Sequence, residues 1–456
     1  MEYFDNRIIR TTIFVFVVAL ILRTGYSYFF IDPEYLILED QGGYVQLGQS
    51  IAKTGDFFQL TDGKHTGRLP GYPTFLAIIY TLFGENNMAV VVVQTIIDSL
   101  TCVVIGLIAK SVIPRSFLVV GMISALNLNM IIHSGMILTD TLFLFLFSIF
   151  ILFAFYYLRH PARLKLFLAI SFLAIATLVR PVSYFLIMLV LLLLIVRFIL
   201  KRIQLKEIMY NILIFLIPIV IAFGAIHQRN YYEYNSFSLV NQGGVHALKW
   251  VVPAVYQYSG QGSYQDGQKF AQKHLELSTK KSILDNIANN PFKSDDYYMK
   301  AAKKALSELG LLNMLHAWSA GAVINLLSPS VASAPSVRSM EHPSFYETPG
   351  KGAIEKLVNY VTNTDGLTYL LIITIGTIIS IMFLITSFFG LYKMIRSEWF
   401  TGVNREIIIF SLVVIIYFVA ITGPIIGVKY RLPFEPILTM FISYLFVKFK
   451  TKNNKI

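Results

Sequence analysis

The apolar runs of this chain constrain its fold more than any other feature. A helix needs about 20 apolar residues to cross roughly 30 Å of hydrocarbon, and about ten runs come close to that length. They lie near residues 10–30, 88–111, 116–133, 139–158, 164–180, 182–200, 208–227, 367–392, 406–426 and 433–449. We therefore expect an all-α polytopic membrane protein with about ten transmembrane helices. The composition agrees: 55% of residues are hydrophobic and 14% are charged, which excludes an ordinary soluble globular protein.

The basic residues cluster between the apolar runs. A formal net charge of +12 could indicate a nucleic-acid-binding protein, but the clusters fit the positive-inside pattern of membrane proteins. We expect no nucleic-acid partner. If the spans alternate, one face receives the clusters around Arg7, Arg115, Arg163, Lys201, Arg396 and Lys450. Both termini are then cytoplasmic, and the first run is a retained span because Arg23 to Tyr26 do not form a signal-peptide cleavage site.

The same alternation divides the chain into three parts. Residues 1–227 form an N-terminal membrane module, and its first outer loop covers 31–87. Residues 228–366 form a large outer-face loop domain that we expect to be mainly helical. Residues 367–456 supply the C-terminal membrane helices and a basic cytoplasmic tail.

Local signals add detail to the outer segments. Ser294, followed by two aspartates, predicts a helix start, and Gly310 predicts its end. The apolar run 72–83 is too short to span a bilayer, so we expect an interfacial or re-entrant helix there. Residues 328–350 are rich in Ser and Pro without periodicity, and we expect them to be mobile without a ligand.

Several ionisable residues fall within or at the ends of the spans, where charge is costly and a functional or paired role is the default. They are Arg23, Asp98, His133, Asp140, Arg180, Lys429 and Arg431. We expect Arg23 to extend toward the headgroups, and Asp98 either to pair with an arginine or to act in catalysis. His133 is a candidate interfacial hydrogen-bonding residue, since no ligand spacing here matches a zinc site.

The first outer loop carries the strongest catalytic candidate. Glu39 and Asp40 precede two glycines, which let a backbone approach a substrate closely. We assign Asp40 as the general base for an attacking hydroxyl and expect Glu39 to be solvated. The alternative is that Asp40 only caps a helix over 41–52. The loop closes with the basic and turn-rich sequence RLPGYP, which begins at Arg68.

Two further outer turns place cations beside prolines. ATLVRPV holds Arg180 at the outer end of two short spans, where a guanidinium suits a phosphate at headgroup depth. GVKYRLPFEP repeats this arrangement with Lys429 and Arg431. The alternative for each is a loop cation that binds ordinary lipid headgroups. Asp140 opens another span, either as a functional acid or as an N-cap or first-turn acid of its helix.

These motifs resemble the GT-C superfamily of membrane glycosyltransferases. Asp40, Tyr44 and Gly48 after the first span, followed by RLPGYP and FLAIIYTLFG, look like the bacterial members similar to protein O-mannosyltransferases and the lipid A aminoarabinose transferase, in glycosyltransferase family 39. Three further segments are similar to other motifs of the family: MILTDTLFLFLFSIFIL, ATLVRPV and YRLPFEP. The resemblance covers roughly residues 1–230 and 367–450, while the loop 228–366 matches no particular member.

The resemblance implies an inverting transfer of a sugar from a polyprenyl-phosphate donor to an acceptor hydroxyl at the outer face of a bacterial inner membrane. The acceptor would be a glycan, a lipid or a protein. The implied catalytic residues are Asp40 and Asp140, and the implied substrate-binding residues are Tyr44, Arg68, Tyr72, Arg180, Lys429 and Arg431. Because Asp140 lacks the paired carboxylates of the oligosaccharyltransferase branch, we assign no metal ligand. We favour metal-independent catalysis over use of a divalent cation.

Other functions stay open at this point. A polysaccharide polymerase or ligase would also use lipid-linked substrates, although RLPGYP speaks against it. A transporter or lipid flippase would need a water-accessible path, for which the spans offer few polar residues. A non-catalytic membrane subunit is the remaining alternative.

Overall fold

The chain is helical almost throughout the part that the structure describes. The computed structural model describes residues 6–38, 40–57, 59–60, 63–64, 66–278, 290–341, 353–362, 365–399 and 402–446. Glu39, which we expected to be solvated, lies outside them. The described residues contain only two strands, β1 (Gln59–Leu60) and β2 (Gly63–Lys64), which pair antiparallel. The expected all-α class is confirmed.

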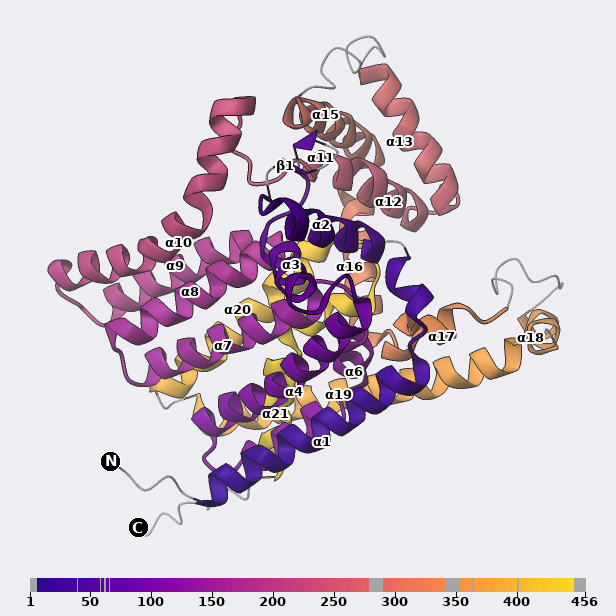
Figure 1. Ribbon diagram of the computed structural model, residues 1–456. Coiled ribbons are helices and arrows are strands. Elements are labelled where there is room, and N and C mark those ends of the chain that lie inside the picture. The colour runs from indigo at the N-terminus through magenta and orange to yellow at the C-terminus, as the bar shows by residue number, and fades with distance from the viewer. Residues whose placement is uncertain are drawn as a thin grey trace.

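Within the same residues, seven helices are long and apolar enough to cross a membrane. They are α1 (Asn6–Phe30), α4 (Asn87–Val112), α7 (Asp140–Arg159), α9 (Tyr184–Leu200, preceded by η2, Pro181–Ser183), α10 (Leu205–Tyr234), α19 (Gly366–Glu398) and α20 (Gly402–Thr422). Two shorter helices, α8 (Arg163–Val179) and α21 (Glu435–Phe446), also coincide with predicted apolar runs. In Figure 1 these helices form one slanted bundle, in which α4 packs against both α1 and α7, and α8 packs against α7. The chain is a multi-pass integral membrane protein.

Two bent helix pairs raise the number of candidate spans to nine in the described part. They are α5 (Phe117–Ala125) with α6 (Leu128–Ser134), bent by 55°, and α15 (Pro291–Leu309) with α16 (Leu311–Leu327), bent by 101°. Asn127 explains the first bend. Its side chain accepts hydrogen bonds from the backbone N–H groups of Asn129 and Met130, so it caps α6 and starts a new helix direction.

A group of helices that follows α10 has a hydrophobic core separate from that of the bundle. It comprises α11 (Gly243–His246), η3 (Ala247–Val251), α12 (Val252–Tyr258), α13 (Tyr264–Ser278), α15 and α16. The core includes Leu248, Val252, Val255, Ala271, Leu275, Ala302 and Leu309. Figure 1 shows α11, α12, α13 and α15 together at the top of the view, above the bundle.

The boundaries of α15 differ in part from the sequence prediction. The helix begins at Pro291, and the side chain of Asn290 accepts a hydrogen bond from the Lys293 N–H at its start. The predicted start at Ser294 is therefore late. Asp295 instead accepts hydrogen bonds from the N–H groups of Gly244 and Val245, which caps α11. The helix ends before Gly310, at φ +85°, as predicted.

Part of the Ser- and Pro-rich segment 328–350 forms short helices that pack against the bundle, while its expected mobility without a ligand stays a prediction. Its first half forms η4 (Ser330–Ser333) and α17 (Pro335–Arg338). Ala334 and Val337 are buried against Ile132, Met136 and Leu138, next to α6. Burial of small apolar side chains holds this segment without helical periodicity. Residues 342–350 lie outside the described part, and α18 (Ala353–Val361) follows them.

Arg23 does not extend toward the headgroups, so this expectation was wrong. Its side chain is fully buried and its Nε donates to Asp98 Oδ2 at 2.5 Å. The guanidinium also donates to the carbonyl oxygens of Ala19 and Ala125. These bonds join α1, α4 and α5 where the low dielectric makes an unpaired charge costly. Asp98 is thus the structural partner of an arginine.

We predict that Arg23→Met destabilises the protein by about 3–5 kcal/mol, because it leaves the Asp98 carboxylate buried without a partner. The double variant Arg23→Met, Asp98→Leu removes both charges and should recover most of that loss. Thermal unfolding of the detergent-solubilised variants measures both effects. If Arg23→Met is as stable as the parent protein, the pairing is contradicted.

Candidate functional site

The glycines of the first outer loop allow close packing around Asp40. A 3₁₀ turn, η1 (Pro33–Ile37), leads into α2 (Asp40–Thr54). A Cβ on Gly42 would lie 2.4 Å from the Ile37 carbonyl oxygen, and a Cβ on Gly43 would lie 3.2 Å from the Arg68 guanidinium. Side chains at these two positions would push the turn and Arg68 away from the start of α2. The glycine pair therefore sets the shape of this corner.

Asp40 is the first residue of α2 and is largely open to solvent. Its side chain is 68% exposed, and Arg68 Nη2 donates to Asp40 Oδ1 at 3.3 Å. The Arg68 guanidinium also lies 3.8 Å from the centroid of the Tyr44 ring, a cation–π contact. The predicted helix after Asp40 is present, so the carboxylate does lie at a helix N-terminus. It is held on one side by Arg68 and is accessible on the other.

The Tyr44 ring packs against both the Arg68 guanidinium and the Tyr72 ring. The two tyrosine rings meet edge to face with centroids 5.1 Å apart. Tyr72 is fully buried, and its hydroxyl donates to Gln94 Oε1 at 2.7 Å. Gln94 in turn donates to the carbonyl oxygen of Met136. Tyr72 is thus linked through Gln94 to the turn before α7. Its contact with substrate stays a prediction.

Tyr44 lies where several charged groups converge. Burial raises the pKa of the Tyr44 phenol above its usual value, so the hydroxyl remains a hydrogen-bond donor at neutral pH. Four charged side chains act electrostatically on this phenol: Asp40, Arg68, Asp140 and Arg180. The structure therefore brings residues of the first loop together with residues predicted on two other turns.

A glycine contact joins the RLPGYP segment to the Arg180 corner. Gly71 begins α3 (Gly71–Phe83), the short apolar helix expected in this region. A Cβ at Gly71 would lie 2.6 Å from the Leu178 carbonyl carbon and 2.7 Å from the Val179 nitrogen. Only a residue without a side chain allows this approach. The contact fixes Arg68 beside the turn that carries Arg180.

Asp140 and Arg180 form an ion pair at that turn. Asp140 is the first residue of α7 and is 3% exposed, and Arg180, between α8 and η2, is 14% exposed. Arg180 Nη1 donates to Asp140 Oδ1. The Arg180 guanidinium also lies 5.9 Å from the Tyr430 ring centroid, on η5 (Val428–Tyr430). The pair therefore connects α7, the α8–α9 corner and the turn before α21.

A polar cavity of about 290 Å³ lies in the same region, and neither Asp140 nor Arg180 is among its described lining residues. Its charged and hydrogen-bonding walls come from Asp40, His133, Ser333, Arg338 and Lys429. Lys429 acts electrostatically on both Asp140 and His133, so the ion pair lies within electrostatic range of the cavity. No carboxylate lies within ion-pairing distance of Lys429 in the part of the chain that the structure describes. Its ammonium is thus available to an anion in the cavity.

His133 presents one ring nitrogen that is free to accept a proton or a hydrogen bond. Its Nδ1 lies 2.8 Å from the Asn129 carbonyl oxygen. Because a carbonyl oxygen can only accept, Nδ1 carries the proton and Nε2 of the neutral ring carries the lone pair. Thr141 also donates to the His133 backbone carbonyl, which fixes α6 against the start of α7. The hydrogen bond expected for His133 is present, the side chain is buried, and the ring lines the cavity; its expected position at the membrane interface stays a prediction.

Arg431 lies apart from the described cavity lining. It precedes η6 (Leu432–Phe434) and is 3% exposed. Its Nε donates to Glu435 Oε1 at 2.7 Å, and its other nitrogens donate to the Leu326 carbonyl and to Ser380. The guanidinium is therefore fully used within the protein. A contact between Arg431 and substrate stays a prediction that requires these partners to be exchanged.

Sequence reasoning did not single out Arg338 or Gln41 at the cavity. Arg338 ends α17, in a segment without periodicity that we expected to be mobile without a ligand. Gln41 accepts a hydrogen bond from the Ile137 N–H and donates to the Tyr35 carbonyl, so it ties α2 to the turn before α7. The one available signal for Gln41 was its position directly after Asp40. Among the described residues, no group of three or more His, Cys, Asp or Glu side chains could hold a metal ion.

The fold is similar to that of GT-C membrane glycosyltransferases. Neither a protein-family model nor a curated protein sequence matches this chain. The oligosaccharyltransferase AglB from Archaeoglobus fulgidus, in complex with an inhibitory peptide and a dolichol-phosphate, matches 97% of this chain and 50% of its own, with 11% identity and a TM-score of 0.51. The Archaeoglobus fulgidus enzyme tethered to an acceptor peptide matches 97% and 49%, with 12% identity and a TM-score of 0.53.

A further solved structure covers more of its own length at a lower score. ArnT from Cupriavidus metallidurans, bound to undecaprenyl phosphate, matches 96% of this chain and 76% of its own, with 13% identity and a TM-score of 0.38. This chain spans about half the length of the archaeal oligosaccharyltransferases. At these identities the likeness is one of fold.

We predict that Arg180→Gln lowers stability by about 3–5 kcal/mol, since it leaves Asp140 charged and almost fully buried. The double variant Arg180→Gln, Asp140→Asn should recover most of that stability, because two neutral amides replace the pair. Thermal unfolding of both variants in detergent checks this. If the double variant is no more stable than Arg180→Gln, the two side chains do not form the pair described here.

Proposed function

We propose that this protein is a glycosyltransferase that moves a sugar from a polyprenyl-phosphate-linked donor to an acceptor hydroxyl. The observation that carries the proposal is a single polar cavity lined by both an exposed carboxylate, Asp40, and a cation available to an anion, Lys429. The dolichol-phosphate bound to the archaeal oligosaccharyltransferase supports a lipid-linked phosphate as the donor class. Because that likeness is one of fold, the activity rests on the site residues.

The proposed reaction is a direct displacement at the anomeric carbon of the sugar. The acceptor oxygen attacks that carbon and forms the new glycosidic bond. The bond from the anomeric carbon to the phosphate oxygen breaks, and its electron pair leaves with the polyprenyl phosphate. The proton of the acceptor hydroxyl passes to the Asp40 carboxylate. Attack opposite the leaving group inverts the anomeric configuration.

The two acids have different tasks in this proposal. Asp40 is open to solvent and held by Arg68 at one oxygen, so its other oxygen can receive a proton. Asp140 is buried and already committed to Arg180, so it serves to orient that guanidinium. A fixed, desolvated cation stabilises charge as it develops on the leaving phosphate. We assign that role to Arg180 together with Lys429.

The remaining predicted contacts are proposed as follows. The Tyr44 hydroxyl and the Arg68 guanidinium border the acceptor beside Asp40. Tyr72 supports Tyr44 from below, and a direct contact between Tyr72 and substrate would require it to leave Gln94. Arg338 supplies an additional cation to the cavity lining, from a segment far from the first loop in the sequence.

We also propose the orientation and division of labour expected from the sequence. Residues 1–227 and 367–456 form the membrane part, and the cavity opens at the outer face if the basic clusters are cytoplasmic. The helices within 228–366 have a separate core and carry η4 and α17 to the cavity wall. We propose that this outer-face domain shapes the acceptor site.

We predict that Asp40→Asn lowers the rate of sugar transfer by about 10²–10⁴-fold, because the amide cannot accept the proton. Transfer of a radiolabelled sugar from a polyprenyl-phosphate donor, by protein in vesicles, measures the loss. Asp56→Asn is a matched control, since Asp56 is exposed just beyond the end of α2 and is absent from the described cavity lining. Normal transfer by Asp40→Asn would end the base assignment.

We predict that Lys429→Gln raises the donor KM about tenfold or more, because one charge-assisted bond to the phosphate is lost. The acceptor KM should change little. Lys53→Gln is the control, because Lys53 lies on α2 and pairs with Glu85. Steady-state kinetics with donor and acceptor varied in turn separate the two constants. An unchanged donor KM would remove Lys429 from the phosphate site.

A further inference from the structure

A second cavity lies between helices of the bundle, away from the proposed active site. It has a volume of about 600 Å³ and is bounded by α7, α8, α9 and α20. Its walls are mainly apolar, with Phe150, Ala154, Leu166, Leu194 and Phe410 among them. A volume of several hundred Å³ with apolar walls is typical of a binding site for an organic ligand. Because α7, α9 and α20 are long and apolar enough to span a membrane, the ligand that has direct access is a lipid.

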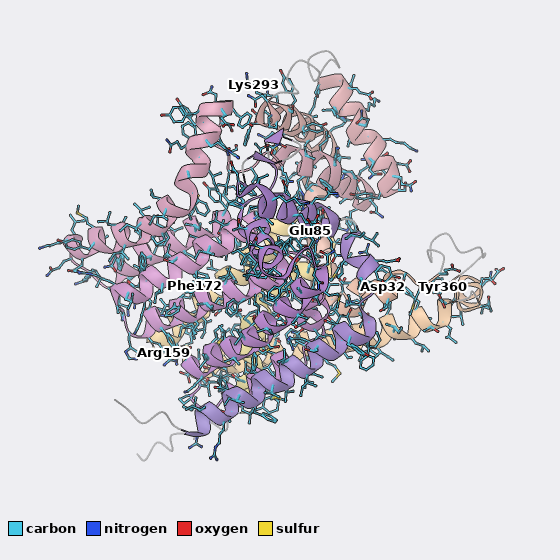
Figure 2. The ribbon with its side chains drawn as sticks, viewed as in Figure 1. Asp32, Glu85, Arg159, Phe172, Lys293 and Tyr360 are labelled. Atoms are coloured by element: carbon cyan, nitrogen blue, oxygen red, sulfur yellow. The ribbon has the colours of Figure 1, made fainter. Side chains whose placement is uncertain are left out.

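The cavity lies at the opposite end of the bundle from Asp140 and Arg180. Asp140 is the first residue of α7, whereas Tyr157 and Leu158 near its end line this cavity. α7 has 20 residues, and a helix of 20 residues is about 30 Å long. In the same way Arg180 precedes α9, and Arg197 and Lys201 lie at its far end. Figure 2 labels Arg159, the last residue of α7, at the end of the bundle away from Asp32 and Glu85.

The mouth of this cavity carries an excess of positive charge. Arg197 and Lys201 both pair with Glu406, at 2.9 Å and 2.8 Å. Arg405 also lines the cavity and is exposed, and no carboxylate lies within ion-pairing distance of it in the described chain. Three cations therefore face one carboxylate. Trp399 lines the same mouth, as expected of an aromatic residue at headgroup depth.

We propose that this cavity binds one anionic phospholipid of the membrane, with an acyl chain between α7, α8, α9 and α20 and its phosphate at Arg197 and Arg405. The apolar walls match the chain, and guanidinium groups suit a phosphate. The excess positive charge selects an anionic headgroup over a zwitterionic one, because the cationic part of a zwitterionic headgroup would be repelled. Basic pockets between membrane helices are a recognised site for such lipids. The site is independent of the sugar-transfer proposal.

Native mass spectrometry of the full-length protein in mild detergent tests this proposal. The probes are phosphatidylglycerol, phosphatidylcholine and undecaprenyl phosphate, each titrated separately and then in competition. We expect phosphatidylglycerol to bind more tightly than phosphatidylcholine, and Arg405→Gln to weaken phosphatidylglycerol binding about fivefold. Ala154→Phe, which fills the apolar part, should also weaken it. Lys393→Gln is the control. It removes a cation near the C-terminal end of α19 that is absent from the described cavity lining, so it should not change lipid binding.

Two results would overturn the proposal. Equal binding of phosphatidylglycerol and phosphatidylcholine, unaffected by Arg405→Gln, would mean that the cavity holds ordinary bilayer lipid without selection. Displacement of phosphatidylglycerol by undecaprenyl phosphate, with the same sensitivity to Ala154→Phe, would assign the cavity to the donor chain. Arg405 is exposed and has no ion-pair partner in the described residues, so its replacement tests the headgroup contact without unfolding the bundle.

Discussion

The ion pair between Asp140 and Arg180 holds together the part of the molecule on which the proposed function depends. Charges among apolar helices must be paired, because the low dielectric makes an isolated ion costly. This pair joins the start of α7 to the α8–α9 corner, and the contact of Gly71 with Leu178 brings the first loop to the same place. Arg23 with Asp98 joins α1 to α4 in the same way, and Arg431 joins the start of α21 to α16 and α19 through the Leu326 carbonyl and Ser380.

The contrast between the two acids follows from their surroundings. Asp140 is enclosed and its partner is fixed, which suits a residue that positions a cation. Asp40 has one weakly held oxygen and an open side, which suits a residue that must gain and lose a proton. His133 and Lys429 complete the cavity with an acceptor nitrogen and a cation that has no carboxylate partner among the described residues. In the proposed reaction, Asp40 takes the proton and Lys429 contacts the leaving phosphate.

Much of the fold could be predicted from the sequence because the membrane imposes long apolar runs, and each expected run coincides with a helix or a bent pair. The 55° bend at Asn127 was not predicted, since it depends on one local cap. The sequence alone could not identify Asp98 as the partner of Arg23, because several acids fall within or near the apolar runs. The cavity wall at Arg338 was missed because a tertiary contact with α6, far away in the chain, orders a segment without periodicity.

The most direct test of the account is a structure of the Asp40→Asn protein with a polyprenyl-phosphate-linked sugar in lipid nanodiscs. We expect the phosphate to lie between Lys429 and Arg180, with the anomeric carbon facing residue 40. A phosphate bound at the other end of the bundle, or outside the polar cavity, would contradict it.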